Sequence, residues 1–177
     1  MTNTLTAQIP SRTTSPALDF EALYRAARDD VYAYVATLLR DRAAAEDVTA
    51  AAFERAYRKQ RTYKAARGSE RAWLFGIARN AALDELRRRR RSAALAAEPA
   101  DLEAQSPEDG AEAALRRAAV RTALATLDPR ERELVALKFH AGLANAEIAA
   151  VLGVSVSNAG TQLHRAMTKL REAVEHA

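Results

Sequence analysis

The sequence predicts an all-α protein in which two small helical domains are joined by a flexible acidic linker. Apolar residues make up 49% of its 177 residues, aromatic residues only 6%, and there are six glycines. This composition favours helices over β-sandwiches or barrels. Apolar side chains recur at three- and four-residue steps before and after residues 92–110, a stretch that contains prolines and has no sustained apolar period.

The composition also excludes several classes of protein. There is no cysteine, which excludes disulfides, thiolate nucleophiles and Cys-based zinc sites. No apolar run approaches the roughly 18 residues of a membrane span, and the N-terminus lacks the apolar core of a secretory signal. The three histidines have no ligand-like spacing with acidic residues. We therefore expect a cytoplasmic protein without membrane insertion, metal, cofactor or catalytic residues.

The first domain is expected to span residues 19–91, after a disordered tail at residues 1–18. Asp19 can cap a helix that runs to about residue 40 and has apolar residues on one side. A tight turn then leads into a second helix over about residues 43–59, whose first turn is acidic and whose last turn is basic.

Residues 61–69 are expected to form a basic loop with an aromatic residue inside it. Tyr63 lies next to Lys64, between Arg61 and Arg67. Because stacking of a base on an aromatic ring is worth about 1–3 kcal/mol, Tyr63 could hold an unstacked base. It could equally close the end of the hydrophobic core, and the sequence favours neither role.

Ser69 can cap a helix that runs to residue 91 and ends in five consecutive arginines. Arg79, Asn80 and Asp84 lie off the apolar stripe of this helix and can face a ligand. The stripe itself consists of Trp73, Leu74, Ile77, Ala78, Ala81 and Ala82. A helix C-terminus needs one or two cations, and five adjacent ones repel unless a polyanion neutralises them. A nucleic-acid surface is therefore favoured over a solvated basic helix end.

The expected linker, residues 92–110, contains acidic residues and no Lys or Arg. About 20 extended residues reach roughly 65–70 Å, whereas one turn of B-DNA is about 34 Å. The linker is therefore long enough for two domains to hold DNA sites on the order of two turns apart.

The second domain is expected at residues 111–177. After a first helix, Asp128 and Glu131 form a capping-box pattern around Pro129. The helix that begins there is expected to bury its inner face and to end at Gly142. The side chains assigned to that inner face are Leu134, Val135, Leu137 and Phe139.

Residues 145–167 have the pattern of a helix-turn-helix. Asn145 can cap a short helix, Gly153 suits the turn, and Ser155 can cap the helix that follows. In this motif the N-terminal part of the second helix contacts base edges in the major groove, and Asn or Gln can pair with adenine. An ordinary helical hairpin is the less favoured alternative. The predicted DNA contacts are Ser155, Ser157, Asn158, Thr161, Gln162 and Arg165.

These motifs resemble a known family. The segment WLFGIARNAALDELRRRRR, preceded by AEDV and FERAY, resembles region two of bacterial RNA polymerase sigma factors. LDPRERELVALKF, AEIAAVLGVSVS and the LHRAM segment before KLRE resemble their region four. The resemblance covers residues 19–91 and 111–174, and the short linker is typical of the extracytoplasmic-function group.

The resemblance implies a division of labour between the two domains. Asp47, Phe53 and Arg55 would dock on the clamp helices of the polymerase β′ subunit, and region four would also rest on the β flap. The helix beginning at Val156 would recognise the minus-thirty-five promoter element. An anti-sigma factor is a further expected partner. The residues implied at the minus-ten element of promoter DNA are Tyr63, Lys64, Arg67, Arg79, Asn80, Arg87 and Arg88.

The sequence departs from the family pattern at two places. Ala50 and Ala51 stand where Gln-Glu is common, which removes two polar contacts to the clamp. Residues 159–162 read AGTQ where Val-Lys-Ser-Arg is frequent, so two cations are missing from the recognition helix. The alternative to a sigma factor is a free-standing helix-turn-helix regulator that binds operator DNA without polymerase. That alternative leaves the arginine-rich helix and the basic loop without a role.

Overall fold

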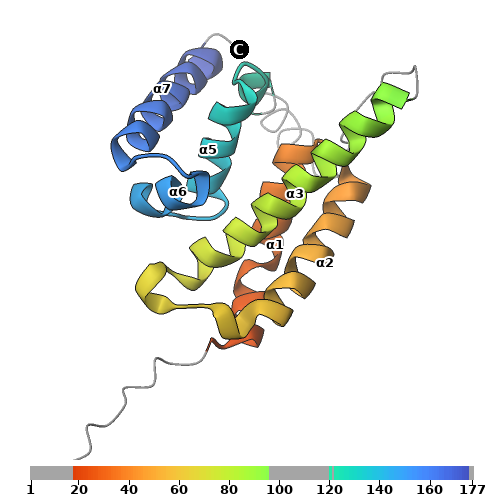
Figure 1. The fold of residues 1–177 in the computed structure, drawn as a ribbon. Helices are drawn as coiled ribbons and strands as arrows, with labels where there is room; N and C mark the ends of the chain where they lie inside the picture. The colour runs from red at the N-terminus through yellow and green to blue at the C-terminus, as the bar shows by residue number, and fades with distance from the viewer. Residues whose placement is uncertain (1–17, 96–119, 121, 176–177) are drawn as a thin grey trace, which may run out of the picture.

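A computed structural model describes residues 18–95, 120 and 122–175 of the chain (Figure 1). Within these ranges all regular structure is helical, which confirms the all-α prediction. The expected tail before residue 18, most of the expected linker and most of the first helix of the second domain lie outside the described residues. Of that last helix, residues 122–125 are described and are helical.

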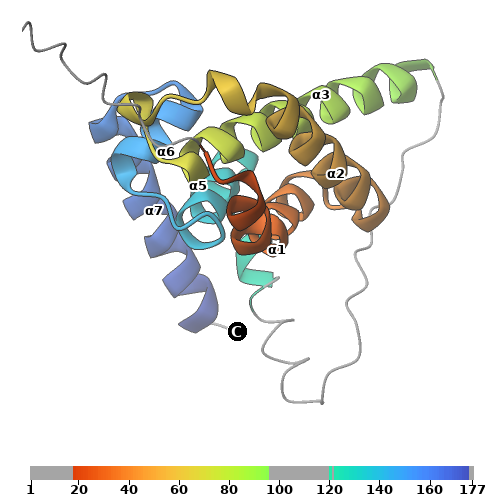
Figure 2. The same cartoon turned by 90° about the horizontal axis from the view of Figure 1, so that it is seen from below.

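The first region contains the helices α1 (Phe20–Leu39), α2 (Arg42–Lys59) and α3 (Glu70–Leu95). The short 3-10 turns η1 (Gln60–Thr62) and η2 (Ala65–Arg67) form the loop between α2 and α3. Figures 1 and 2 show α3 lying across α1 and α2, with its C-terminal end projecting past them. The helix continues past residue 91, where it was expected to end, because the following Ser-Ala-Ala-Leu contains no helix breaker.

Side-chain caps begin these helices. The Asp19 carboxylate accepts a hydrogen bond from the Ala22 amide at 3.0 Å, and the Ser69 hydroxyl accepts one from the Ala72 amide at 3.1 Å. Both caps confirm the sequence prediction. Asp41 accepts from the Ala44 amide at 3.1 Å and so begins α2 one residue earlier than expected.

The core of the first region centres on two buried aromatic rings, those of Tyr34 and Phe75. Their centroids are 5.4 Å apart in an edge-to-face arrangement, and both side chains are fully buried. The buried face of α3 is Ala72, Leu74, Phe75, Ala78, Ala81 and Ala82. Trp73 and Ile77 of the predicted stripe are half-buried and pack against the edge of this core.

The second region contains α5 (Pro129–Phe139), α6 (Asn145–Leu152) and α7 (Val156–Glu175). The predicted capping box is present, since the Asp128 carboxylate accepts from the Glu131 amide at 2.9 Å and Glu131 accepts from the Asp128 amide at 3.1 Å. Gly153 has a φ of 68° between α6 and α7, as the turn requires.

Two predictions for the second region are wrong. Asn145 is the first residue of α6 rather than its cap, and the preceding Ala144 amide donates to the Glu147 carboxylate at 2.9 Å. Phe139 does not bury its ring but is 62% exposed. It is the last residue of α5, and the buried positions of that helix, residues 133–137, lie before it.

The two regions pack against each other. One continuous hydrophobic core runs from α1, α2 and α3 into α5, α6 and α7. Helix α5 packs on α1 and α6 packs on α3, as the two views show (Figures 1 and 2). This contact was not expected from the sequence, which suggested two bodies on a tether.

Candidate nucleic-acid interface

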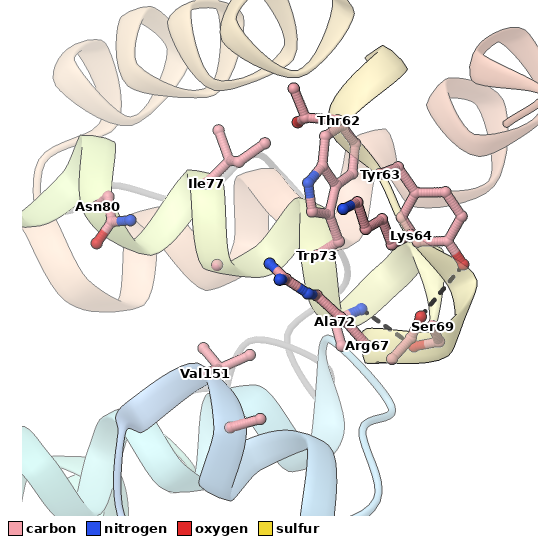
Figure 3. A pocket seen from close by; sticks show the side chains of 13 residues that line it. Thr62, Tyr63, Lys64, Arg67, Ser69, Ala72, Trp73, Ile77, Asn80 and Val151 are labelled. Atoms are coloured by element: carbon pink, nitrogen blue, oxygen red, sulfur yellow. Dashed lines mark hydrogen bonds between the residues drawn. The ribbon is translucent and has the colours of Figure 1, made fainter. Parts of the chain in front are cut away.

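A pocket of about 500 Å³ opens between the η1–η2 loop and the first half of α3 (Figure 3). The loop contributes Tyr63, Lys64 and Arg67 to its wall, and both cations are exposed. Helix α3 contributes the faces of Trp73, Ile77 and Asn80. Aromatic and apolar walls with cations at the rim suit an unstacked base and its phosphates.

Tyr63 contacts Trp73 at the edge of the core and also lines the pocket. Its ring lies 5.7 Å from that of Trp73, and its hydroxyl donates a hydrogen bond to the Gly68 carbonyl at 3.2 Å. Burial, and secondarily the charge of Glu70, raise the pKa of Tyr63, so the hydroxyl remains a donor at neutral pH. These contacts leave both predicted roles of Tyr63 open.

Three of the five arginines at the end of α3, Arg87, Arg88 and Arg89, pair with acidic residues of the same chain. Arg87 donates to Asp84 at 3.1 Å, and Arg88 donates to Glu85 at 2.7 and 2.8 Å. Arg89 donates both to Glu85 and to the cap residue Asp41, each at 2.8 Å. These cations were expected to need a polyanion, and the structure shows local carboxylates that hold the side chains of Arg87, Arg88 and Arg89 in place.

The stability of the first region depends on pH through the ionisation of the Glu85 side chain. Hydrogen bonds from Arg88 and Arg89 lower the pKa of Glu85 from its ordinary 4.5 to about 2. Because the folded pKa is lowered, the stabilisation is complete above about pH 5 and is lost as the pH falls toward 2. We expect Glu85→Gln to lower the free energy of unfolding by about 1–2 kcal/mol at pH 7, after screening at the exposed Arg88.

Urea unfolding followed by circular dichroism at pH 7, 4 and 2 measures this effect. The wild-type and Glu85→Gln curves should converge toward pH 2. Glu21→Gln, in an exposed pair with Arg25 on α1, is the matched control and should change little. A constant gap between wild type and Glu85→Gln at all three pH values would contradict the assignment.

Arg79, which the sequence predicted to face a ligand, pairs with a carboxylate of the second region. Its guanidinium donates to the Glu133 carboxylate of α5 at 2.7 Å, and its side chain is only 23% exposed. Asn80, the next residue, is exposed and lines the pocket. Asn80 therefore lines the pocket at the start of α3, whereas Arg79 lines a second pocket together with Glu133.

The recognition face of α7 is exposed. Ser157, Asn158, Thr161 and Arg165 are exposed and Gln162 is half-buried. The Gln162 side-chain amide donates to the Asn158 side-chain oxygen at 2.7 Å, which holds both amides on one face. Ser155 acts as the predicted cap, since its hydroxyl accepts from the Asn158 amide at 3.2 Å.

The three candidate polymerase contacts on α2 lie in different environments. Asp47 is exposed, and Arg55 is exposed and donates to Asp84 at 3.4 Å. Phe53 is 6% exposed and packs edge-on against Phe20 and Tyr24. It still lines a surface pocket of about 560 Å³ together with the buried Thr49, whose hydroxyl has no hydrogen-bond partner within the described part of the chain.

Several residues that organise the site were missed by the sequence analysis. Glu133 is buried in α5 and contacts Tyr34 and Arg79. Arg71 bridges the regions by donating to the Ala141 carbonyl at 2.8 Å and the His140 carbonyl at 3.1 Å. For Glu133, the one available sequence signal was its position immediately before the apolar run Leu-Val-Ala-Leu.

Two features are absent from the described part of the chain, a membrane-spanning helix and a cluster of metal ligands. None of the described helices is both long enough and apolar enough to cross a bilayer. Among the described side chains, no group of three or more His, Asp or Glu residues is placed to hold a metal ion.

The fold and these surfaces define a two-region helical protein with a helix-turn-helix and a pocket of aromatic and basic residues at the start of α3. The family description Sigma-70 region 2 matches residues 23–92, and Sigma-70, region 4 matches residues 117–170. The chain is 32% identical over 166 residues to the ECF RNA polymerase sigma factor SigL of Mycobacterium tuberculosis, covering 91% of this chain and 94% of SigL. The chain belongs to the extracytoplasmic-function group of the sigma-70 family.

A second relative is similar in sequence, and two solved structures are similar in fold. The chain is 35% identical over 154 residues to the ECF RNA polymerase sigma factor BldN of Streptomyces coelicolor, covering 85% of this chain but 58% of BldN. Its fold is similar to that of RpoE in a co-crystal structure with the anti-sigma factor NepR from Bartonella quintana, with a TM-score of 0.77 and 23% identity over 89% of this chain and 97% of that one. CnrH in complex with the cytosolic domain of CnrY gives a TM-score of 0.65 and 24% identity, over 89% of this chain and 88% of CnrH.

Proposed function

We propose that this chain is a sigma factor that binds core RNA polymerase and directs it to promoter DNA for transcription initiation. The observation that carries this proposal is the presence, in one chain, of an exposed recognition face on α7 and an aromatic-basic pocket at the start of α3. A regulator that binds an operator needs only the first of these. Sigma factors are in general not enzymes, and we assign no catalytic residue.

Each region has its own task in this proposal. Residues 19–91 dock on polymerase and hold the melted minus-ten element, residues 92–110 connect the regions, and residues 111–177 recognise the minus-thirty-five element and contact the β flap. Flipping a base costs a few kcal/mol, and stacking in the Tyr63 pocket offsets much of that cost. Asn158 and Gln162, already aligned on α7, provide base contacts in the major groove.

The polymerase clamp helices would contact α2 at Asp47 and Arg55, beside the pocket that Phe53 lines. Ala50 is part of that pocket and offers only a methyl group there. Docking therefore depends more on shape and apolar contact than on polar pairs. An anti-sigma factor is a further partner, by analogy with the complexes of RpoE and CnrH. The site of action is the cytoplasm, on the nucleoid.

Run-off transcription with purified core polymerase, on genomic fragments, tests the function. We expect defined start sites that appear only when both core enzyme and this chain are present. A gel-shift assay with and without core enzyme separates the alternative. Tight and specific binding of a duplex by the isolated chain, together with no effect on initiation, would instead identify a free-standing regulator.

A further inference from the structure

The pocket that Arg79 and Glu133 line has a volume of about 400 Å³ and is bordered by residues of α1, α3, α5 and α6. We propose that this pocket binds a nucleotide that carries at least two phosphates. Its ligand is neither promoter DNA nor polymerase, so the site goes beyond the function proposed above. We call it the arginine pocket, because four of its lining residues are arginines: Arg79, Arg90, Arg130 and Arg132.

The arginine pocket has an excess of positive charge. Among the described residues that line it, Glu133 is the one carboxylate, and it is already paired with Arg79 at 2.7 Å. Arg90 and Arg130 are exposed, and neither has a carboxylate partner within the described part of the chain. Together with Arg132, three guanidinium groups therefore border one pocket without an ion-pair partner in the described chain. Cations held this close repel one another unless an anion lies between them.

Arg132 is held in place by the backbone. Its Nε donates to the Leu124 carbonyl at 3.2 Å, and its terminal nitrogen donates to the Leu127 carbonyl at 2.8 Å. Burial, and next the charge of Arg40, lower the pKa of Arg132, so a further cation lies near it. The group still carries its charge at neutral pH, and it has more N–H donors than the two carbonyls accept. Arg132 is therefore an oriented donor for an anion.

Much of the remaining wall of the arginine pocket is apolar. It includes four partly exposed leucines, Leu38, Leu83, Leu86 and Leu152. Small-molecule sites are typically about 300–1,000 Å³ in volume, with mostly apolar walls and a few placed polar groups. An apolar wall accommodates a ring system, and a guanidinium can also stack on a planar base. The pocket therefore suits a ligand with a flat organic part and an anionic part.

The number of unpaired arginines indicates the kind of anion. A phosphate monoester carries a charge of about −1.5 to −2 at neutral pH, so two phosphates neutralise three guanidinium groups. Single carboxylates would have to be three in number. The planar guanidinium also matches a phosphate with two parallel hydrogen bonds. A nucleoside diphosphate or triphosphate meets both requirements in one small molecule.

A DNA duplex matches the arginine pocket less well than a nucleotide does. Arg79 is only 23% exposed and Arg132 is half-buried, so a phosphate on the convex surface of a duplex would reach mainly Arg90 and Arg130. The leucines beside them would then face a polar backbone. The recessed arginines and the apolar wall both favour a small ligand that enters the pocket.

Isothermal titration calorimetry of the full chain, without polymerase or promoter, tests the site. The probes are ATP, GTP, AMP and inorganic tripolyphosphate. We expect saturable one-to-one binding of at least one of the two nucleoside triphosphates, with AMP and tripolyphosphate each about tenfold weaker or more. The absence of such binding for both triphosphates would overturn the site. Tripolyphosphate binding as tight as that of the nucleotide would overturn the assignment to a nucleotide.

Matched variants separate the arginine pocket from general attraction to a basic chain. Arg90→Ala and Arg130→Ala should each weaken nucleotide binding about tenfold, since each removes a charged hydrogen bond. Arg25→Ala removes the same charge from an exposed pair on α1 and should leave the affinity unchanged. Leu83→Ala should weaken the nucleotide but not tripolyphosphate. Equal effects of Arg25→Ala and Arg130→Ala would overturn the proposal.

Competition with DNA provides the last control. A DNA duplex at a concentration equal to that of the bound nucleotide should not displace it. Full displacement would assign these arginines to the DNA backbone and overturn the nucleotide site. Far-UV circular dichroism should show the wild-type helix content for every variant. Because run-off transcription uses polymerase and a promoter and the calorimetry uses neither, a failure of one is distinguishable from a failure of the other.

Discussion

Replacing Phe75 with alanine should lower the free energy of unfolding by about 3–5 kcal/mol, a large part of the stability of a domain this size. Phe75 is fully buried on α3, and its ring packs edge-on against Tyr34 with centroids 5.4 Å apart. The Arg71 guanidinium lies over the same ring, 5.6 Å from its centroid. The substitution therefore leaves a cavity at the centre of the core and also removes an aromatic and a cation–π contact.

Urea unfolding followed by circular dichroism measures the effect. Phe139→Ala is the matched control, because Phe139 is 62% exposed at the end of α5 and its loss should change stability by at most about 0.5 kcal/mol. Phe75→Leu, which fills most of the space, should fall between the two. Equal unfolding midpoints for Phe75→Ala and Phe139→Ala would place the core elsewhere than in this structure.

Local signals predicted the local structure well. Asp19, Ser69, Asp128 with Glu131, Gly153 and Ser155 each act at the position where the sequence placed them. Caps and turns depend on hydrogen bonds between residues two to four positions apart, so a short window contains the information. Asn145 is not the cap because the helix begins one residue earlier than expected, so that Ala144 takes the cap position and its amide donates to the Glu147 carboxylate.

Contacts between distant segments could not be predicted in the same way. Tyr34 and Glu133 are 99 positions apart, and Arg79 and Glu133 are 54 positions apart. A helical pattern shows that Glu133 and Arg79 lie near apolar stripes, but it does not show that two stripes face each other. Trp73 and Ile77 were assigned to the core from their helical spacing. In the structure they pack at the edge of the core and also border a pocket, which the spacing could not show.

In the candidate site, as in the fold, local features could be predicted from the sequence and contacts between distant segments could not. Residue types and motif spacing indicated which segments carry Tyr63, Asn80 and Asn158. Arg87 and Arg88 lie three residues after Asp84 and Glu85, a spacing that favours pairing on one helix, whereas the contact of Arg89 with Asp41, 48 positions away, could not be predicted from the sequence. Because these arginines are already paired with carboxylates of the chain, a DNA phosphate would have to compete with those carboxylates for them.

Tyr63→Ala should reduce formation of the open promoter complex by about tenfold or more, since loss of one base–aromatic stack costs about 1–3 kcal/mol. Tyr63 is half-buried in the wall of the pocket, so part of its ring is accessible. Run-off transcription and permanganate footprinting of unpaired thymines measure the defect in the holoenzyme. On a template whose minus-ten region is already mismatched, the defect should shrink, because the cost of extracting the base is then already met.

Tyr63→Phe separates stacking from the structural role of the same side chain. It keeps the ring beside Trp73 and loses only the hydrogen bond from the hydroxyl to the Gly68 carbonyl. If the ring holds a base, Tyr63→Phe should transcribe at close to the wild-type level while Tyr63→Ala does not. If the residue only closes the core, both variants should form open complexes normally once folded, and their helix content and unfolding midpoints should report the whole effect. Equal open-complex yields for Tyr63→Ala and wild type, on fully paired DNA, would exclude the pocket as the place where the flipped base is held.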